Sequence, residues 1–168
     1  YQGIGIAYST FFSPSQLGNP VLLYAFQGSR IMQFSPRLSL DYEWNFGASF
    51  GWKKYDEQLN PYNNVIGSKI NAYINLGFLL NWQLHPRWNL VAGVDFTHYS
   101  NGNTHYPNGG VNPIGGRIGV VYTLREEEAV LKSSGTARPK GLSVKPSICY
   151  DLMVYGATRK RGFIKDDI

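Results

Sequence analysis

The segment His98-Tyr99-Ser100 carries an imidazole and a hydroxyl two residues apart. Alternate residues of a β-strand project from the same face, so these two side chains are neighbours if the segment is a strand. An imidazole that takes the proton of a serine hydroxyl makes that serine a nucleophile. A hydrogen-bond acceptor at the other ring nitrogen then fixes the tautomer of the imidazole. The pair therefore indicates acyl transfer, with the serine attacking a carbonyl group.

The residues before this pair predict a strand over 87–100 with one apolar face. The side chains of that face are Trp88, Leu90, Ala92, Val94, Phe96, His98 and Ser100. In a soluble protein the apolar face of a strand lies in the core, whereas in a transmembrane barrel it faces lipid. Polar side chains at the end of a lipid-facing row have no structural purpose there, so the membrane arrangement favours a functional role for the pair.

Composition and the neighbouring strands favour the membrane. Charged residues make up 16% of the chain, below the roughly 25% that is usual for soluble domains, while aromatic residues reach 15% and glycine occurs 19 times. Alternation over 38–53 and 69–84 predicts strands of about fifteen residues. Strands of soluble proteins are shorter and usually have about five or six residues. We therefore expect an all-β, antiparallel, up-and-down transmembrane β-barrel of outer-membrane type with about eight or more strands. A soluble β-sandwich or lipocalin-like barrel is the alternative.

The two faces of these strands assign the outside and the inside of the barrel. The apolar rows are expected to face lipid, with aromatic girdles that include Trp52, Trp82 and Trp88. The polar rows are expected to fill a narrow interior. There the charged side chains are expected to form pairs, drawn from Asp41, Glu43, Arg37, Lys53 and Lys69.

Turn lengths orient the barrel. Ser35-Pro36 and His85-Pro86 predict tight periplasmic turns, whereas 53–66 and 101–111 predict long outer loops. The strand over 87–100 then runs outward and carries its polar pair to the outer leaflet. Further strands near 3–12, 20–34, 112–124 and 144–157 bring the count to seven. Because such barrels normally have an even count, at least one strand is expected to be missing from this chain, or a protein partner closes the barrel.

Asn112 is the candidate third member of the site. The strand over 112–124 places it at the outer end of a lipid-facing row, across the 101–111 loop from His98. Its amide oxygen can accept a hydrogen bond from the imidazole, as asparagine does in some cysteine hydrolases. An ordinary asparagine at a strand end is the alternative reading.

These residues resemble the active-site hairpin of a known family. The run from His98 to Asn101, the segment Pro107-Asn108-Gly109-Gly110-Val111-Asn112 and the alternating strand after it are similar to the PagL family of outer-membrane lipid A 3-O-deacylases, also labelled acyloxyacyl hydrolases. The resemblance is specific over residues 87–124, and the upstream strands resemble Bacteroidetes-type members.

The resemblance implies roles for individual residues. Ser100 would be the nucleophile and His98 the general base, and Asn101 with the backbone of Gly102 would form the oxyanion hole. The family has a glutamate where this chain has Asn112. Asparagine can orient the imidazole but supplies no negative charge to stabilise an imidazolium.

The implied function is hydrolysis of an ester-linked acyl chain of lipid A, in lipopolysaccharide of the outer membrane of a Gram-negative bacterium. The alternative is a catalytically decayed barrel of the same ancestry that acts as a structural or complex-forming component. No cofactor or metal is expected, because Cys149 is the single cysteine and no His, Asp or Glu residues show a metal-binding spacing. Nucleic acid is not an expected partner, because the basic run Arg159 to Arg161 has no nucleic-acid-binding motif beside it. That run could instead attract the lipid phosphates.

Three parts of the chain are expected. Residues 1–124 form barrel strands and include the site hairpin at 87–124. Residues 125–142 form a periplasmic excursion or linker that begins with a short helix over 125–132. Residues 143–168 add a further strand and an outer loop.

Overall fold

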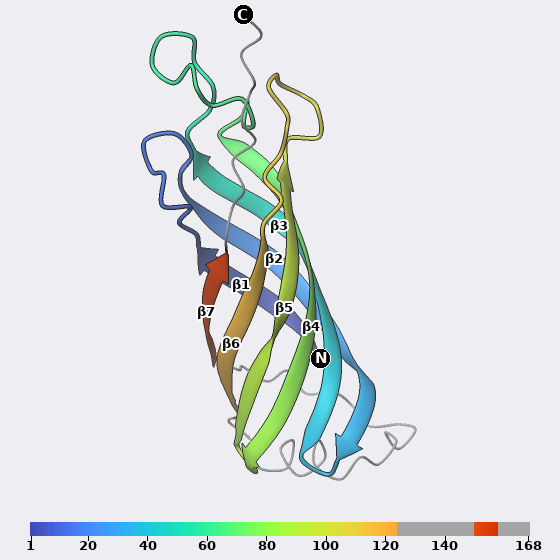
Figure 1. Cartoon of the computed structure of the whole chain (residues 1–168). Coiled ribbons are helices and arrows are strands. Elements are labelled where there is room, and N and C mark those ends of the chain that lie inside the picture. Colours follow the sequence, from blue (N-terminus) through green and yellow to red (C-terminus); the bar gives the residue numbers. More distant parts are fainter. Residues whose placement is uncertain (124–149, 158–168) are drawn as a thin grey trace, which may run out of the picture.

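A computed structural model describes residues 1–123 with their side chains, and residues 150–157 by their backbone. Seven strands form one sheet in the order of the chain, and each strand pairs antiparallel with the next (Figure 1). They are β1 (Gln2–Tyr8), β2 (Gly18–Ser35), β3 (Leu38–Trp52), β4 (Ile70–His85), β5 (Trp88–Ser100), β6 (Ile114–Tyr122) and β7 (Tyr150–Ala157). The sheet curls around a central axis, which confirms the predicted all-β, up-and-down barrel architecture.

The connections differ sharply in length between the two ends of the sheet. Residues 36–37 join β2 to β3, and residues 86–87 join β4 to β5, so both predicted tight turns are present. The connections over 9–17, 53–69 and 101–113 are longer and gather at the opposite end (Figure 1). Because β5 runs from the tight turns toward the long loops, its last residues lie at the loop end.

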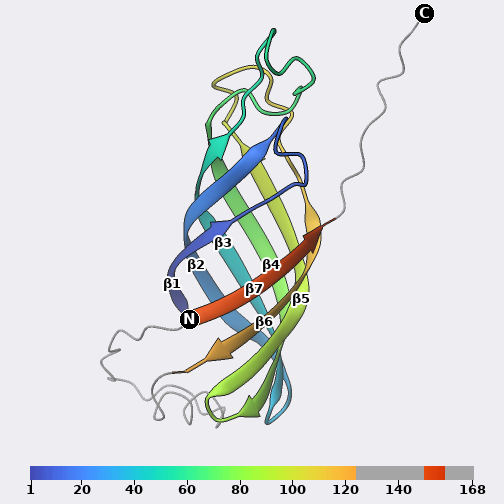
Figure 2. The same cartoon turned by 90° about the vertical axis from the view of Figure 1, so that its left-hand side faces the viewer.

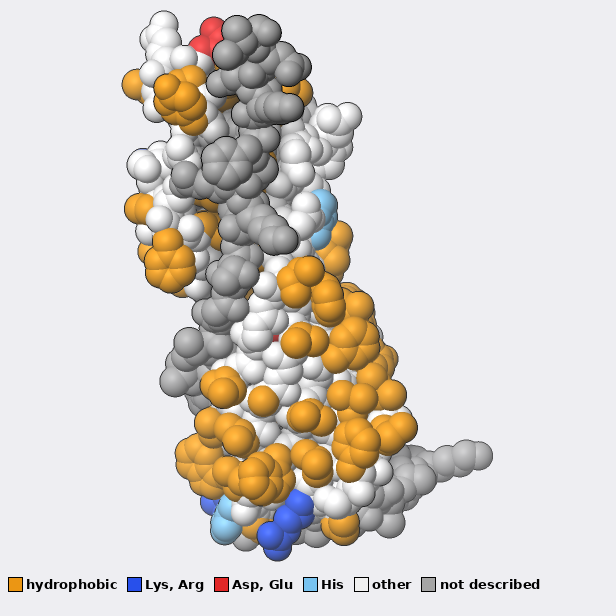
Figure 3. Space-filling view, in the orientation of Figure 1, with side chains coloured by type: hydrophobic (Ala, Val, Ile, Leu, Met, Phe, Trp, Pro, Cys, Tyr) orange, Lys and Arg blue, Asp and Glu red, His pale blue; other side chains and the backbone are white. Residues whose placement is uncertain are grey.

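The faces of the wall are those expected for a barrel in lipid. On β3 the inward side chains of Asp41, Glu43 and Asn45 are at most 8% exposed, whereas the outward Trp44 and Phe46 are 41% and 58% exposed. Apolar side chains cover the wall between the two ends in Figure 3. A soluble barrel would enclose the apolar row and expose the polar one, so this arrangement excludes the soluble alternative. No helix in the described residues has the length and hydropathy to cross a membrane.

The barrel interior holds a network of charged and amide side chains. Arg117 donates from Nε to Asp95 Oδ2 at 2.9 Å and from Nη2 to Asp95 Oδ1 at 2.5 Å, and Nη1 reaches Glu43 Oε1 at 2.6 Å. Gly77 makes room for this pair, because a Cβ there would lie 2.7 Å from Asp95 Oδ1. A buried charge is tolerated when it is paired and hydrogen-bonded in this way.

The cations of this network differ from those expected. Arg37, Lys53 and Lys69 are exposed at the two ends of the wall, and Arg117 on β6 is the enclosed cation. The expected interior role of those three residues is therefore wrong. All three residues lie just outside the strands, in the turn before β3, directly after β3 and directly before β4, so the alternation of the strands does not determine their burial.

An aromatic cluster fills the barrel interior below the long loops. Trp52 stacks on Phe11 at a centroid distance of 5.2 Å and meets Tyr99 at 5.1 Å, and Tyr99 also contacts Tyr73 at 5.4 Å. Trp52 is 2% exposed, so its expected place in the outer girdle is wrong. Gly51 has a φ of +90°, which breaks the alternation and turns the next side chain inward.

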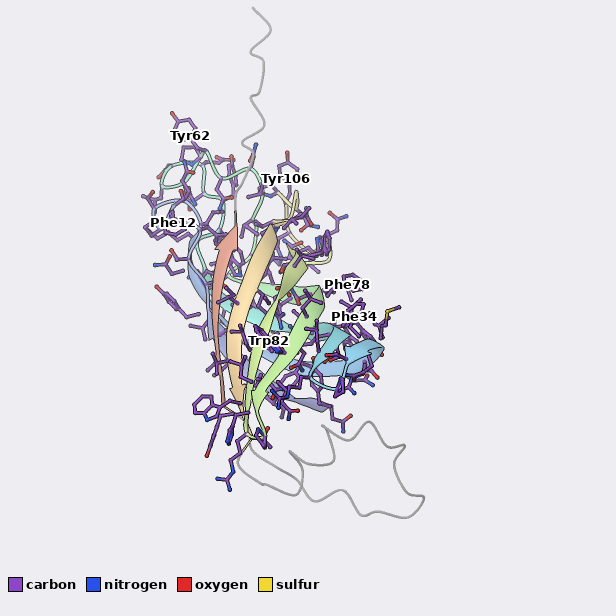
Figure 4. The ribbon with its side chains drawn as sticks, turned by 60° about the horizontal axis from the view of Figure 1, so that its bottom comes forward. Phe12, Phe34, Tyr62, Phe78, Trp82 and Tyr106 are labelled. Atoms are coloured by element: carbon purple, nitrogen blue, oxygen red, sulfur yellow. The ribbon has the colours of Figure 1, made fainter. Side chains whose placement is uncertain are left out.

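The other two predicted girdle residues do face outward. Trp82 and Trp88 are 51% and 46% exposed and lie near the tight turns. Phe78, farther along β4, is also exposed on the wall, while the labelled loop aromatics Phe12 and Tyr106 lie toward the long-loop end in Figure 4.

The sheet has two edge strands, β1 and β7 (Figure 2). Both run from the tight-turn end toward the loop end, because an even number of antiparallel steps separates them. The strand predicted at 144–157 is present over Tyr150–Ala157. The predicted excursion over 125–142 and the outer loop after residue 157 lie outside the described residues.

Candidate active site

The register of β5 and β6 brings His98 and Asn112 face to face. Phe96 pairs with Ile114 at the last regular step of the ladder. The pairing then continues beyond β6, because Thr97 N–H donates to Pro113 O at 3.0 Å and Tyr99 forms an isolated bridge with Val111. Opposed residues of an antiparallel pair have Cβ atoms about 5 Å apart, which is close enough for two side chains to bond.

His98 and Asn112 form that bond. His98 Nδ1 lies 2.6 Å from Asn112 Oδ1. A carbonyl oxygen can only accept, so Nδ1 carries the imidazole proton and Nε2 keeps its lone pair. The contact predicted from the alternation is therefore present, and it holds the imidazole in the tautomer that a general base needs.

Ser100 lies on the same outward face of β5 as His98. On the neighbouring strand β4, Ala72 is opposite Ser100 and Ile74 is opposite His98. Both polar side chains are partly exposed, and the outward apolar residues of β4 and β5 surround them on the wall. A lipid ester beside the barrel can thus reach the hydroxyl and the imidazole from the membrane side.

Tyr99 anchors the strand between these two residues. It points inward, is 4% exposed and belongs to the aromatic cluster with Trp52 and Tyr73. Its N–H and carbonyl exchange hydrogen bonds with Val111 at 2.9 and 3.0 Å. Because successive strand residues alternate, an immobilised Tyr99 directs both of its neighbours outward.

Gly110 supports the imidazole from the loop side. Its φ is +66°, a conformation in which an L side chain is strained. A Cβ at this position would lie 2.9 Å from Tyr99 O and 3.3 Å from His98 Cε1. Only glycine therefore allows the loop to return this close beneath the ring. Sequence reasoning did not assign Gly110 a role, because the contact depends on how the loop folds back.

The two residues expected at the oxyanion hole follow Ser100 directly. Asn101 N–H donates to Asn108 Oδ1 at 3.2 Å, and Asn101 Nδ2 donates one of its two hydrogens to His105 O at 2.7 Å. Gly102 has a φ of +65°, and nothing lies within 4 Å of the position its Cβ would occupy. The loop bonds of Asn101 thus hold the turn in which Gly102 presents an open backbone.

The other two histidines and the enclosed Asp95 lie away from this site. His105 is exposed in the outer loop and His85 ends β4 at the tight turn, while Asp95 is enclosed with Arg117. Cys149 and the run Arg159 to Arg161 fall outside the described residues. Within residues 1–123, no group of three His, Cys, Asp or Glu side chains could hold a metal ion.

The wall and the site together define a class of protein. A barrel with an apolar outer wall and a polar, hydrogen-bonded interior is typical of the outer membrane. The outward face of β5 also carries a hydrogen-bonded imidazole and, two residues away, a serine hydroxyl, which are residue types that serine hydrolases use.

The family comparison agrees with this class. The model of the family described as lipid A 3-O-deacylase (PagL) matches residues 2–121, and the chain belongs to that family. No curated protein and no solved structure matches the chain. The matched range contains β1 to β5, all of β6 except Tyr122, and every residue of the candidate site. Family membership makes the protein a hydrolase of the lipid A deacylase type, whose family acts on lipopolysaccharide and resides in the outer membrane.

Proposed function

We propose that this protein removes an ester-linked acyl chain from lipid A through a catalytic triad of Ser100, His98 and Asn112. The observation that carries the proposal is the 2.6 Å contact between His98 Nδ1 and Asn112 Oδ1, beside a serine on the lipid-facing side of the same strand. The loop end of β5, where this contact lies, corresponds to the outer leaflet, because outer-membrane barrels carry their long loops outside the cell. Lipopolysaccharide of a Gram-negative bacterium presents its acyl esters in that leaflet.

The reaction proceeds as acyl transfer followed by hydrolysis. Ser100 Oγ attacks the ester carbonyl carbon while His98 Nε2 takes the hydroxyl proton, and the carbonyl oxygen becomes an oxyanion. Collapse of this intermediate breaks the bond to the sugar oxygen, which leaves with the proton from His98. Water then attacks the acyl-serine with His98 again as base, which releases a fatty acid and restores Ser100.

The oxyanion is stabilised by donors that follow the nucleophile. We assign this role to the backbone N–H of Gly102 and to the second amide hydrogen of Asn101 Nδ2, whose first hydrogen is bonded to His105 O. Removing a single such donor from a hydrolase typically costs 10²–10³-fold or so in turnover. Asn112 orients the base but does not neutralise the imidazolium, so the proposed enzyme lacks one stabilising charge.

Mass spectrometry of lipid A tests the proposal. Cells or vesicles that contain the folded barrel are expected to lose one ester-linked acyl chain, and the Ser100→Ala variant is expected to keep the full set. The Ser15→Ala variant, which changes an exposed hydroxyl in the connection over 9–17, is the matched control and should remain active. If parent and Ser100→Ala samples retain the same acyl set while both are folded, the protein is a structural component instead of a deacylase.

A further inference from the structure

The lysines of the described residues are concentrated at one place. Lys53 and Lys54 follow the end of β3, and Lys69 directly precedes β4. Lys69 O accepts hydrogen bonds from Gly51 N–H at 3.2 Å and Trp52 N–H at 3.4 Å, so these segments lie side by side on the rim of the barrel. All three lysines are exposed.

The other cations of residues 1–123 are placed differently. Arg37 and Arg87 lie in the two tight turns at the opposite end of the wall. Arg117 is bonded to Asp95 and Glu43 inside the barrel, and Arg30 approaches Asp41 at 3.8 Å. Among residues 1–123, the lysine and arginine side chains at the long-loop end are therefore Lys53, Lys54 and Lys69.

Two carboxylates share the loop with the lysines. Asp56 Oδ1 accepts the N–H groups of Leu59 and Gln58 at 2.9 and 3.0 Å, and these bonds hold the pKa of Asp56 below its usual value, with a smaller effect from Lys54. Asp56 thus partly offsets Lys54, and Glu57 is exposed beside it.

Lys53 and Lys69 have no carboxylate partner among residues 1–123. The loops over 9–17 and 101–113 contain no aspartate or glutamate, and no ion pair joins either lysine to a carboxylate within residues 1–123. These two lysines consequently form a small cationic surface at the base of the outer loops.

Lys69 is the lysine of this surface that lies nearer to the candidate nucleophile along the neighbouring strand β4. Ala72 is the residue of β4 that faces Ser100, and Lys69 is three residues farther along the chain toward the rim. At about 3.3 Å per residue, the two positions are about 10 Å apart along the strand. A sugar ring and an extended lysine side chain span that separation.

We propose that Lys53 and Lys69 bind a phosphate group carried by the glycolipid whose acyl ester lies at Ser100. Ammonium groups are compact charges with several donors and are effective ligands of phosphate. Binding there would hold the sugar headgroup above the bilayer while the acyl chain remains beside the wall. This inference rests on the proposed deacylase function, since it uses the same substrate position, but it concerns recognition and not bond cleavage.

Binding measurements in a Ser100→Ala background test this site without turnover. Detergent-solubilised barrel is mixed with micelles of phosphorylated lipid A, or of the same lipid after removal of its phosphates. We expect the Lys53→Gln/Lys69→Gln variant to bind the phosphorylated lipid more weakly, by about fivefold per lysine, and to bind the dephosphorylated lipid as its parent does. The Arg37→Gln/Arg87→Gln variant removes the same charge at the opposite end and should bind both lipids as the parent does.

Three outcomes would overturn the proposal. The first is unchanged affinity of the lysine variant for phosphorylated lipid A, and the second is an equal loss for the dephosphorylated lipid. The third is binding of inorganic phosphate alone as tight as that of the lipid, which would show a site for free phosphate. Because the binding is measured without cleavage, these outcomes are independent of whether the Ser100→Ala change abolishes deacylation.

Discussion

At the scale of single residues, the hydrogen bond between His98 and Asn112 determines what the site can do. It favours the tautomer with the proton on Nδ1, which in the neutral ring leaves the lone pair on Nε2 for the proposed role as base. An aspartate in the same place would do this and would also stabilise the imidazolium that forms during attack. In the serine-protease template, exchange of the acid for asparagine costs about 10⁴-fold in turnover.

The Asn112→Asp variant is therefore expected to be more active than the parent. The side chains are nearly isosteric, so the carboxylate can occupy the position of the amide 2.6 Å from the imidazole. We expect kcat for lipid A deacylation to rise about tenfold or more, because the imidazolium gains an anionic partner. Asn112→Ala serves as the opposite control and should reduce kcat. A kcat that is equal in all three proteins would show that Asn112 does not act on the base.

Gly110 provides a second prediction at this scale. Gly110→Ala forces a methyl group to within 2.9 Å of Tyr99 O and 3.3 Å of His98 Cε1, at a φ of +66°. We expect kcat to fall about tenfold or more through displacement of the imidazole, while the barrel still folds. Gly109→Ala is the matched control, since a Cβ there would meet Asn64 O and Val65 Cγ1 at an ordinary 3.4 Å. Equal activity of the two variants in a lipid A deacylation assay would contradict the positioning role.

At the scale of elements, the alternation of β5 could be predicted from the sequence. That alternation also predicts on which face most of the candidate site residues lie. A period of two places His98 and Ser100 on one face of the strand and Tyr99 on the other. The register that brings Asn112 opposite His98 also follows from two apolar rows and a loop between them. The role of Gly110 could not be predicted, because it depends on the path of that loop and on a positive φ.

The position of Trp52 shows where a strand pattern fails. The alternation of β3 predicted an outward tryptophan, but Gly51 adopts a φ of +90° and reverses the sides. Trp52 instead donates from Nε1 to Ser49 Oγ at 2.8 Å inside the barrel. Glycine in a strand permits both geometries, so the sequence alone does not distinguish them.

Trp52→Ala is expected to destabilise the loop end of the barrel. Loss of a buried aromatic side chain typically costs about 3–5 kcal/mol of unfolding free energy, because the surrounding residues cannot refill the space. Denaturant unfolding in lipid vesicles measures this effect. Trp82→Ala is the control and should cost less, because lipid chains can fill the gap on the outer wall. An equal cost for both variants would contradict a packed cluster beneath the loops.

At the scale of the whole molecule, polarity is reversed relative to a soluble protein. The sequence did not identify the interior cation. Arg117 on β6 fills that role, and it lies far along the chain from its partner Glu43 on β3. Pairing between distant strands depends on how the sheet curls, which no local pattern shows. The two faces themselves could be predicted, since every long strand repeats the same alternation.

This polarity predicts how the barrel responds to a charge on its wall. Leu76→Arg places a cation at an outward position of β4 that is 41% exposed and lies between Trp44 and Phe96 on the adjacent strands. We expect a loss of about 2–4 kcal/mol in unfolding free energy in lipid vesicles, which is typical for arginine at mid-membrane. Leu59→Arg, in an outer loop where the leucine is 88% exposed, is the matched control and should be nearly neutral. Similar costs at the two positions would contradict a lipid-facing wall.

The open edges of the sheet have a consequence for how its motions reach the candidate site. β1 and β7 are the edge strands of the described sheet, while β5 is paired along its length with β4 on one side and β6 on the other. Strand separation that starts at the β7 edge must therefore part β7 from β6 before it reaches β5, and separation that starts at β1 must first pass through β2, β3 and β4. Local opening of this barrel is expected to be more frequent at β1 and β7 than at β5, which keeps a paired neighbour on both sides.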